Sequence, residues 1–245
     1  MTKKTKFKRV LIKLTGELLG LPGEKGIEFD EVDKISKGIL KIKRRTKSDM
    51  AIVVGGGNLV RGRDAGSQVD KATADYIGTL GTIMNGLALE ESLNRIAGKN
   101  VAVLMTSLQI FSLAEPFFRK KALRYFEKDK IIVLAGGVGS PFFTTDSGAA
   151  LRAAELLCDV ILKGSTIDGV YEKDPKKFPK ARKYKYLNYE TALKKQIKVM
   201  DSNAFAICQS EKIPILVFKA EDLGRILDGE KLGTMVADVE DEFFD

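Results

Sequence analysis

Short runs of apolar residues alternate along this chain with stretches in which apolar residues recur every three or four positions. The short runs are typical of buried parallel strands, and the recurring pattern is typical of amphipathic helices. Together they indicate an α/β fold in which helices cover both faces of a mainly parallel sheet. The pattern predicts strands at residues 9–14, 51–54, 101–105, 131–134, 160–162, 213–218 and 232–236. It predicts helices at residues 71–97, 115–128 and 221–227, and further helices that begin near residues 30, 146 and 202.

Individual residues mark the ends and faces of the predicted helices. Asp30 is expected to cap the helix that follows it. Asp75 lies near the start of the long helix, where its carboxylate would either cap the helix or accept a hydrogen bond from a sugar hydroxyl. Gly78, Gly81 and Gly86 each cost about 1 kcal/mol in a helix interior relative to Ala. We therefore expect another helix or a subunit to approach that helix closely.

Two segments have no clear helical or strand pattern. Residues 164–187 form a long polar stretch, and loops of that length in a compact domain are usually functional or disordered. Residues 237–245 form an acidic tail with two phenylalanines, which we interpret as a mobile end. The sequence has no internal repeat and no low-complexity linker.

Composition narrows the class of protein. The chain has 245 residues, of which 44% are hydrophobic and 30% charged, values that fit one large globular domain or two tightly joined lobes. A net charge of +8 suits an anionic partner such as a nucleotide or nucleic acid, although surface lysines that are simply solvated would give the same balance. The chain has no histidine, which excludes Ser–His and Cys–His catalysis and argues against a metal site formed by side chains.

The sequence also bears on location. Cys158 and Cys208 lie in apolar stretches with a helical pattern and are expected to be buried thiols in a reducing compartment. The basic start of the chain is not a signal peptide, because Lys13 interrupts the apolar run. No apolar segment is long enough to span a bilayer. These features predict a cytoplasmic protein.

Glycine-rich loops follow several of the predicted strands. After the strand at 131–134, Gly136, Gly137 and Gly139 allow a ligand or another segment to approach the backbone closely. Thr144, Thr145 and Asp146 then precede a helix, and any of these residues could cap it. Bare amides and hydroxyls at a helix N-terminus form an anion site, whereas an ordinary turn between strand and helix is the alternative.

The first two strands end in similar loops. Lys13 lies at the carboxyl end of the first strand, followed by Thr15 and Gly16, which places it well to meet a phosphate. The second strand leads into Gly55-Gly-Gly-Asn, followed by Arg61. This loop is neither a P-loop, since it lacks Gly-Lys-Ser/Thr, nor a dinucleotide fingerprint, since valine replaces the third glycine.

The carboxyl ends of parallel strands meet at one edge of a sheet, so these loops are expected to gather there with Lys163. Lysines, glycine loops and aspartates suit phosphoryl transfer between two anions, a reaction that needs positioning and charge neutralisation rather than a histidine base. An aspartate between lysines would hold their ammonium groups in place. Mg²⁺ would offset further phosphate charge.

The chain resembles the bacterial UMP kinases of the amino-acid-kinase superfamily from about residue 8 to residue 236. The ordered motifs that carry the resemblance are Lys13-Leu-Thr-Gly-Glu, Gly55-Gly-Gly-Asn, Arg61-Gly, Asp75-Tyr-Ile-Gly, Asn85-Gly-Leu-Ala, Pro141-Phe-Phe-Thr-Thr-Asp146, Asp168-Gly-Val-Tyr, Asp174-Pro175 and Lys198-Val-Met-Asp201. The resemblance implies a three-layer αβα sandwich around a mainly parallel sheet, and ATP-dependent conversion of UMP to UDP with Mg²⁺. It also implies a cytoplasmic homohexamer that GTP activates and UTP inhibits in many members.

The resemblance also implies residue roles and a division of one domain, residues 1–245. Residues 1–155 would hold the monophosphate acceptor, residues 156–236 the ATP, and residues 237–245 are the tail. ATP would be bound by Lys13, Leu14, Thr15, Gly16, Gly57, Arg61, Ser165, Tyr171 and Asp174. UMP would be bound by Gly56, Asp75, Val138, Gly139, Ser140, Pro141, Phe142, Phe143, Thr144 and Thr145. Lys13 would be catalytic, Asp146 and Asp201 would organise the catalytic lysines, and no residue is predicted to bind a metal.

The chain departs from the family pattern at two places. Val138-Gly139-Ser140-Pro141 replaces the usual Thr-Gly-Asn-Pro, which removes polar side chains expected to read the uracil edge. Residues 163–166 replace Lys-Ala-Thr-Lys/Arg and lose one positive charge near the nucleotide. The first departure bears on base selectivity more than on reaction type.

Two other functions remain open from the residues. One is a kinase of the same superfamily that phosphorylates a carboxylate, a carbamate or isopentenyl phosphate. The other is a non-catalytic nucleotide sensor or a basic DNA-binding regulator, although no nucleic-acid-binding motif is present and the basic residues are dispersed, so no nucleic-acid partner is expected.

Overall fold

The computed structural model describes residues 7–60, 69–197, 199–227 and 229–244. The strands are β1 Arg9–Leu14, β2 Asp49–Val54, β3 Ala102–Thr106, β4 Glu115–Pro116, β5 Ile131–Ala135, β6 Val160–Ser165, β7 Tyr184–Asn188, β8 Ile215–Lys219, β9 Thr234–Ala237 and β10 Glu242–Phe243. The α-helices are α1 Phe29–Thr46, α2 Lys71–Ala97, α3 Arg119–Glu127, α4 Thr145–Glu155, α5 Tyr189–Lys194, α6 Ser202–Ser210 and α7 Leu223–Leu227. Two 3₁₀ helices, η1 Gly16–Leu19 and η3 Ala220–Asp222, lie between them.

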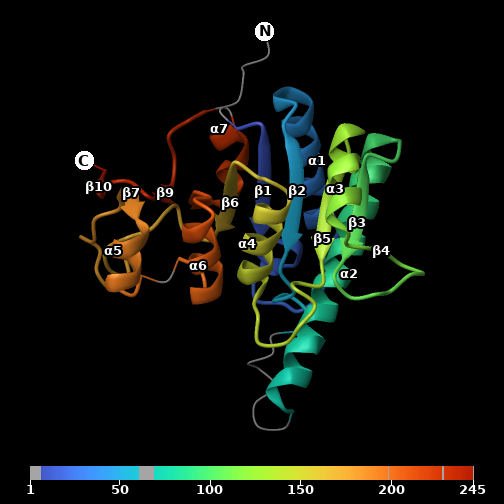
Figure 1. The fold of residues 1–245 in the computed structure, drawn as a ribbon, viewed down its shortest axis with the longest axis horizontal. Helices are drawn as coiled ribbons and strands as arrows, with labels where there is room; N and C mark the ends of the chain where they lie inside the picture. The colour runs from blue at the N-terminus through green and yellow to red at the C-terminus, as the bar shows by residue number, and fades with distance from the viewer. Residues whose placement is uncertain (1–6, 61–68, 198, 228, 245) are drawn as a thin grey trace.

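The strands of the described residues form one ten-stranded sheet in the order β10-β7-β9-β8-β6-β1-β2-β5-β3-β4 (Figure 1). The pairs β8–β9 and β7–β10 are antiparallel, and the remaining pairs are parallel. β1 lies at the centre, in register with β2 from Arg9–Asp49 to Leu14–Val54 and with β6 from Val10–Val160. The prediction of a mainly parallel sheet is confirmed.

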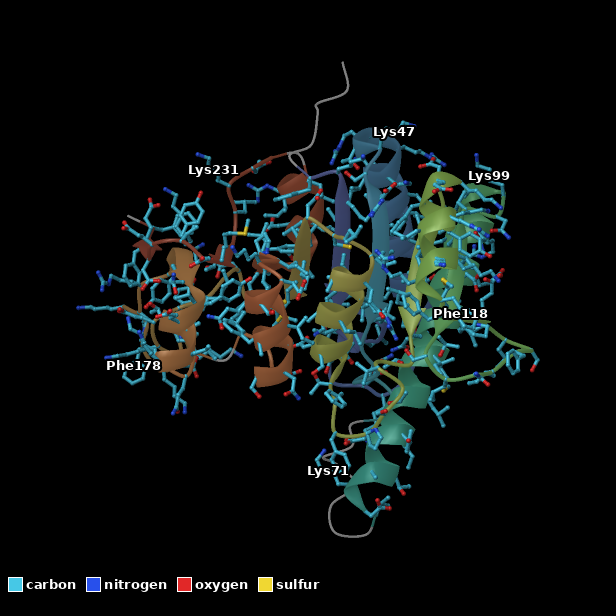
Figure 2. The ribbon with its side chains drawn as sticks, in the orientation of Figure 1. Lys47, Lys71, Lys99, Phe118, Phe178 and Lys231 are labelled. Carbon is cyan, nitrogen blue, oxygen red and sulfur yellow. The ribbon has the colours of Figure 1, made fainter. Side chains whose placement is uncertain are left out.

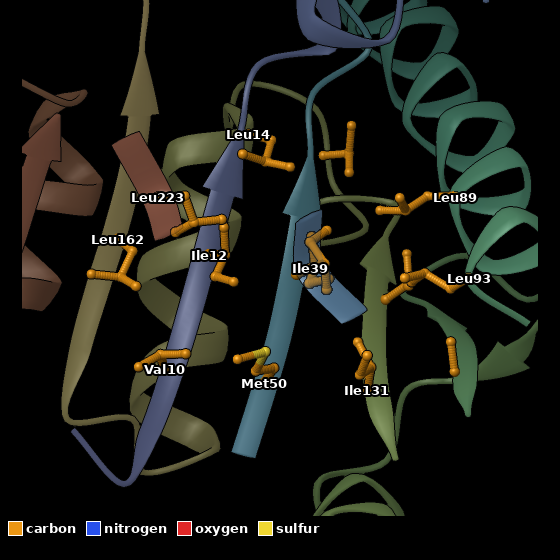
Figure 3. Close-up of a cluster of buried hydrophobic side chains, with 14 of the residues drawn as sticks. Val10, Ile12, Leu14, Ile39, Met50, Leu89, Leu93, Ile131, Leu162 and Leu223 are labelled. Carbon is orange, nitrogen blue, oxygen red and sulfur yellow. The ribbon is translucent and has the colours of Figure 1, made fainter. Parts of the chain in front are cut away.

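Alternate side chains of the central strands point to opposite faces, and each face is covered by helices. Val10, Ile12 and Leu14 pack on one side with residues of α1, α2 and α7 (Figure 3). Leu11 and Val53 pack on the other side with residues of α3, α4 and α6. Because the strands are apolar on both faces, the fold has three αβα layers, as predicted.

Some of the predictions about local structure were wrong. The predicted helix at residues 115–128 begins only at Arg119, because Pro116 lies in β4, which pairs with β3, and proline cannot donate the hydrogen bonds of a helix interior. Asp30 does not cap α1; Glu28 does, by accepting a hydrogen bond from the Asp30 amide. Of the two roles expected for Asp75, capping α2 is ruled out, because Asp70 is the cap and accepts from the Thr73 amide.

The polar stretch at residues 164–187 has ordered parts, and the tail is more ordered than the mobile end that was predicted. Tyr171 forms an isolated bridge with Lys183, and β7 begins at Tyr184. The tail returns to pair with β7 as β10, where the ring of Phe243 stacks on Tyr184 at a centroid distance of 4.3 Å. The two phenylalanines of the tail therefore serve packing, which the acidic composition concealed.

Two of the helix glycines, Gly81 and Gly86, are approached closely by other parts of this chain. A Cβ at Gly81 would lie 3.5 Å from the Gly56 carbonyl, and one at Gly86 would lie 2.8 Å from the Leu104 side chain. These glycines admit a loop and a strand rather than another helix of the described chain. Cys158 and Cys208 are both buried, with Cys158 just beyond α4 rather than within it. Among the described residues, no helix is long and apolar enough to cross a membrane.

Candidate active site

A cavity of about 890 Å³ opens where the loops after β1, β2 and β5 meet the first half of α2 and the N-termini of α4 and α6. In Figure 1, α2 extends beyond the sheet at this edge, and Figure 2 labels Lys71 near its far end. The lining residues are Lys13, Thr15, Gly16, Glu17, Gly55, Gly56, Gly57, Val60, Val69, Lys71, Ala74, Asp75, Gly78, Thr79, Thr82, Gly137, Val138, Ser140, Phe143, Thr144, Thr145, Asp146 and Asp201. The predicted gathering of strand-end loops is thus present.

Two lysines from adjacent parallel strands share one carboxylate, and Lys13 and Asp146 of this trio line the cavity whereas Lys163 does not. Lys13 and Lys163 are register partners on β1 and β6, so their side chains point the same way. Lys13 Nζ lies 2.8 Å from Asp146 Oδ1, and Lys163 Nζ lies 2.8 Å from Asp146 Oδ2. Lys163 also donates to the carbonyl of Val199. The carboxylate therefore fixes the two ammonium groups relative to each other.

The charges of this trio depend on one another. Burial by itself would raise the pKa of Asp146, but the ammonium groups of Lys13 and Lys163 outweigh it and hold that pKa below its usual range. Burial lowers the pKa of Lys163, and the neighbouring Lys13 lowers it further, while Asp146 opposes both effects. The lowered pKa of Asp146 favours its ionised form, and one carboxylate facing two lysine side chains suits a phosphate ligand.

Asp201 joins two helix N-termini at the cavity. It caps α6 by accepting from the Ala204 amide at 2.9 Å. It also accepts from the hydroxyl of Thr144 and, at 2.9 Å, from the hydroxyl of Ser147 on α4. Its effect on the lysines is exerted through space, because its charge raises the pKa of Lys163. Ser147 is buried and was not among the predicted residues.

The glycine loop after β2 is held by two buried asparagines that sequence reasoning did not select as site residues. Asn85 on α2 donates to the Gly55 carbonyl at 2.7 Å and to Asn58 Oδ1 at 2.7 Å, and Asn58 donates to the Gly26 carbonyl at 2.7 Å. A Cβ at Gly16 would lie 2.5 Å from Asn58 Oδ1. The glycines are required because the loops pack directly on one another.

The loop at residues 136–145, which we call the acceptor loop, closes the other side of the cavity. Its Thr144 hydroxyl caps α4 by accepting from the amides of Asp146 and Ser147. At the tip, Phe142 has a φ of +69° and its amide donates to Asp75 at 2.9 Å. Lys71 lies 2.8 Å from the same Asp75 oxygen, and these contacts hold the pKa of Asp75 below its usual range despite partial burial.

The predicted residues are distributed unevenly around the cavity. Those that line it are Lys13, Thr15, Gly16, Gly56, Gly57, Asp75, Val138, Ser140, Phe143, Thr144, Thr145, Asp146 and Asp201. Leu14, Gly139, Pro141, Phe142, Ser165, Tyr171 and Asp174 are outside the lining. Arg61 lies outside the described residues.

The predicted nucleoside-binding residues have partners of their own beyond β6. The Tyr171 hydroxyl donates to Asp168 at 2.8 Å, and Lys183 forms an ion pair with the same carboxylate at 2.9 Å. Ser165 accepts from the Ile167 amide at 3.3 Å, and Asp174 accepts from the Lys176 amide at 3.0 Å. These side chains shape the segment after β6.

No group of three or more His, Cys, Asp or Glu residues in the described part of the chain is placed to hold a metal ion. The carboxylates of Asp146 and Asp201 are already engaged by lysines, hydroxyls and amides. A divalent cation in this cavity would therefore depend mainly on ligands supplied by the substrates.

Comparisons with known proteins agree with this geometry. The sequence pattern of the amino acid kinase family matches residues 8–219. A uridylate kinase from Zymomonas mobilis subsp. mobilis is 41% identical to this chain, and the alignment covers 98% of this chain and 100% of the relative. The crystal structure of a UMP kinase from Bacillus anthracis has a TM-score of 0.93 and 35% identity, covering 98% of this chain and 99% of that one. A UMP kinase structure from Ureaplasma parvum has a TM-score of 0.86 at 35% identity, covering 94% of this chain and 98% of that one. The chain therefore belongs to the amino acid kinase family.

Proposed function

We propose that this protein is a nucleoside monophosphate kinase that transfers the γ-phosphoryl group of ATP to UMP and releases UDP and ADP. The observation that carries the proposal is the Lys13–Asp146–Lys163 trio, of which Lys13 and Asp146 line a cavity bounded by glycine loops and a helix N-terminus. The likeness to uridylate kinases over nearly the whole chain supports UMP as acceptor.

The trio would act through charge. In phosphoryl transfer, negative charge is spread over the equatorial, attacking and leaving oxygens, so fixed positive groups stabilise the transition state. Asp146 is bonded to both lysines and is not placed as a base, and a phosphate acceptor is already ionised at neutral pH. The residues therefore position two anions and neutralise their charge as they approach each other.

The acceptor would occupy the side of the cavity formed by the acceptor loop. Thr145, at the start of α4, would offer its amide and hydroxyl to the phosphate, and Thr144 lines the cavity beside it with its hydroxyl donated to Asp201. Gly56 and Asp75 would contact the sugar and phosphate from the opposite wall. Because the side chain of Val138 has no hydrogen-bonding group, backbone groups of residues 138–141 would read the base, together with Phe142 and Phe143.

ATP would occupy the side of the cavity nearer β6. The segment from Lys13 to Gly16, together with Gly57 and Arg61, would contact its phosphates. Ser165, Tyr171 and Asp174 would hold its ribose and adenine, so that residues 156–236 form the ATP lobe and residues 1–155 the acceptor lobe. Mg²⁺ would come bound to ATP and supply further charge neutralisation, since the carboxylates in the cavity are engaged.

The wider setting follows from the same family. The proposed reaction is a step of pyrimidine nucleotide biosynthesis in the cytoplasm. The first half of α2 leaves apolar side chains exposed, including Leu80 at 48% and Met84 at 52%. We propose that this face is covered by another subunit in a homohexamer, and that GTP activates and UTP inhibits the assembled enzyme.

A substrate panel tests the proposal directly. Purified protein is mixed with Mg·ATP and separately with UMP, dUMP, CMP, AMP and GMP, and release of ADP is measured. Turnover restricted to UMP is expected. Preference for another nucleoside monophosphate would support the proposed reaction type but contradict UMP as the acceptor. No turnover with any of these acceptors would contradict the proposed function.

A further inference from the structure

Arg152 is a buried cation that the proposed reaction does not use. It belongs to α4, it is 8% exposed, and it does not line the cavity. Burying a guanidinium is costly unless its charge and its donors find partners. The partners of the Arg152 guanidinium show which part of the molecule this side chain supports.

The guanidinium joins α4 to the start of the loop after β3. Its Nη2 donates to the Ser107 hydroxyl at 2.8 Å, its Nη1 donates to Glu155, and its plane lies over the ring of Phe117 at 3.9 Å. The Ser107 hydroxyl in turn donates to the carbonyl of Gly137 at 2.7 Å. Arg152 is thereby linked through one hydroxyl to the backbone of the acceptor loop.

The backbone of the acceptor loop turns sharply at three glycines. Gly136, Gly137 and Gly139 have φ values of +80°, +55° and +85°, and the Gly139 amide donates to the Gly136 carbonyl at 3.0 Å. A Cβ at Gly139 would lie 3.3 Å from the Cβ of Ser107, and a Cβ at Gly148 would lie 3.2 Å from Gly137. The glycine turn is therefore held between Ser107 on one side and α4 on the other.

We infer that Arg152 and Ser107 are positioning residues that hold the acceptor loop in its binding conformation. Neither side chain lines the cavity, while Gly137, Val138 and Ser140, which the loop carries, do. The Arg152 charge also polarises the Ser107 hydroxyl and strengthens its bond to the Gly137 carbonyl. This inference rests on the proposed function for the identity of the acceptor, but its structural part does not.

Steady-state kinetics separate positioning from general stability. The hydrogen bonds from Arg152 to Ser107 and from Ser107 to the Gly137 carbonyl form a relay. Ser107→Ala removes this relay with little change in volume, and Arg152→Met removes the cation. Both variants are expected to raise the KM for UMP by about 3- to 10-fold, the equivalent of one lost hydrogen bond. The KM for ATP should stay within about twofold of wild type, because the acceptor loop is not on the ATP side. Glu155→Gln is the matched control, since it breaks the ion pair of Arg152 and leaves the relay in place.

A second measurement needs no substrate. Hydrogen exchange of the ligand-free protein follows the amides of residues 136–142, and the Gly139 amide is expected to exchange faster in Ser107→Ala than in wild type or Glu155→Gln. Unchanged exchange there, or equal increases in the KM for UMP and ATP, would overturn the inference. So would a Glu155→Gln variant with the same acceptor defect as Arg152→Met. If wild type fails to phosphorylate UMP, the proposed function fails while the exchange result still decides the role of the relay.

Discussion

At the scale of single residues, Lys13 combines burial with a charge that faces the cavity. It is 8% exposed and lies 2.8 Å from Asp146. Lys13→Met should lower kcat by at least about 100-fold, because a fixed charge on the transferring group is lost. The fold should be retained, since Asp146 keeps Lys163 as its partner. ADP release and a thermal unfolding curve check both points. Lys8→Met, on an exposed residue just before β1, is the control, and turnover near the wild-type rate in Lys13→Met would disprove the assigned role.

Lys163 is expected to make kcat fall as the pH becomes alkaline. Burial, with a contribution from Lys13, lowers the pKa of this lysine from its ordinary value of 10.5. As the pH rises, the ammonium group therefore loses its proton, and its charge, below pH 10.5. We expect kcat to fall on the alkaline side with an apparent pKa below that value, measured in a pH–rate profile with saturating substrates.

A matched substitution identifies the group responsible for the alkaline fall. Lys163→Arg keeps the positive charge, and a guanidinium remains protonated throughout the accessible range. The variant should be slower, because the planar group cannot reproduce the contacts with Asp146 and Val199. Its remaining activity should nevertheless stay level where that of the wild type declines. A decline at the same pH in both proteins would assign the alkaline fall to another group.

At the scale of elements, α2 has glycines with opposite effects on stability. A Cβ at Gly86 would lie 2.8 Å from Leu104 and 3.2 Å from Ala135, whereas the nearest atom to one at Gly78 is the Val60 carbonyl oxygen at 4.0 Å. Gly86→Ala should destabilise the protein by about 1–3 kcal/mol through overpacking. Gly78→Ala should stabilise it by up to about 1 kcal/mol through helix propensity alone. Urea unfolding measures both, and equal effects would show that packing against the sheet is not what requires Gly86.

The short strand β10 shows what the acidic tail contributes. The ring of Phe243 stacks on Tyr184, and the guanidinium of Arg182 lies over it at 4.0 Å. Phe243→Ala should cost about 1–2 kcal/mol of unfolding free energy, with kcat/KM unchanged because β10 is outside the cavity lining. Phe178→Ala, at a 51% exposed ring in the same half of the molecule (Figure 2), is the control and should change stability by less than about 0.5 kcal/mol. A Phe243→Ala variant as stable as wild type would mean that the Phe243 ring adds nothing to the fold.

These elements also show what sequence patterns can and cannot predict. β1 and α2 were predicted with the bounds that the structure has, because an apolar run and a long series of apolar residues at helical spacing are local signals. β10 and α5 were missed, since a two-residue strand and a short helix gain their stability from distant partners. Pro116 was the signal that could have corrected the start of α3, because it lies within the predicted helix.

At the scale of the whole molecule, the cavity was predictable and its supports were not. Because the carboxyl ends of parallel strands lie at one edge of a sheet, Lys13, Gly56 and Thr145 were expected to lie close together. All three line the cavity in the structure. Asn58 and Ser107 act through hydrogen bonds to backbone carbonyls at distant positions, and Arg152 acts through the Ser107 hydroxyl. Their residue types are common on surfaces and in cores, so a single sequence gives no signal for such bonds.

Assembly is the property of the whole molecule that the α2 surface makes testable. Tyr76, Leu80 and Met84 recur every four residues and are 42%, 48% and 52% exposed, so they form one apolar stripe on the helix. If another subunit covers this stripe, a carboxylate there would be buried without a partner. Leu80→Glu should therefore dissociate the proposed hexamer of 27.0 kDa chains, as measured by light scattering after gel filtration. Leu193→Glu, at an equally exposed leucine on α5, is the matched control and should leave the mass unchanged. A Leu80→Glu protein with the wild-type mass would exclude this face from the interface, and a monomeric wild type would refute the hexamer itself.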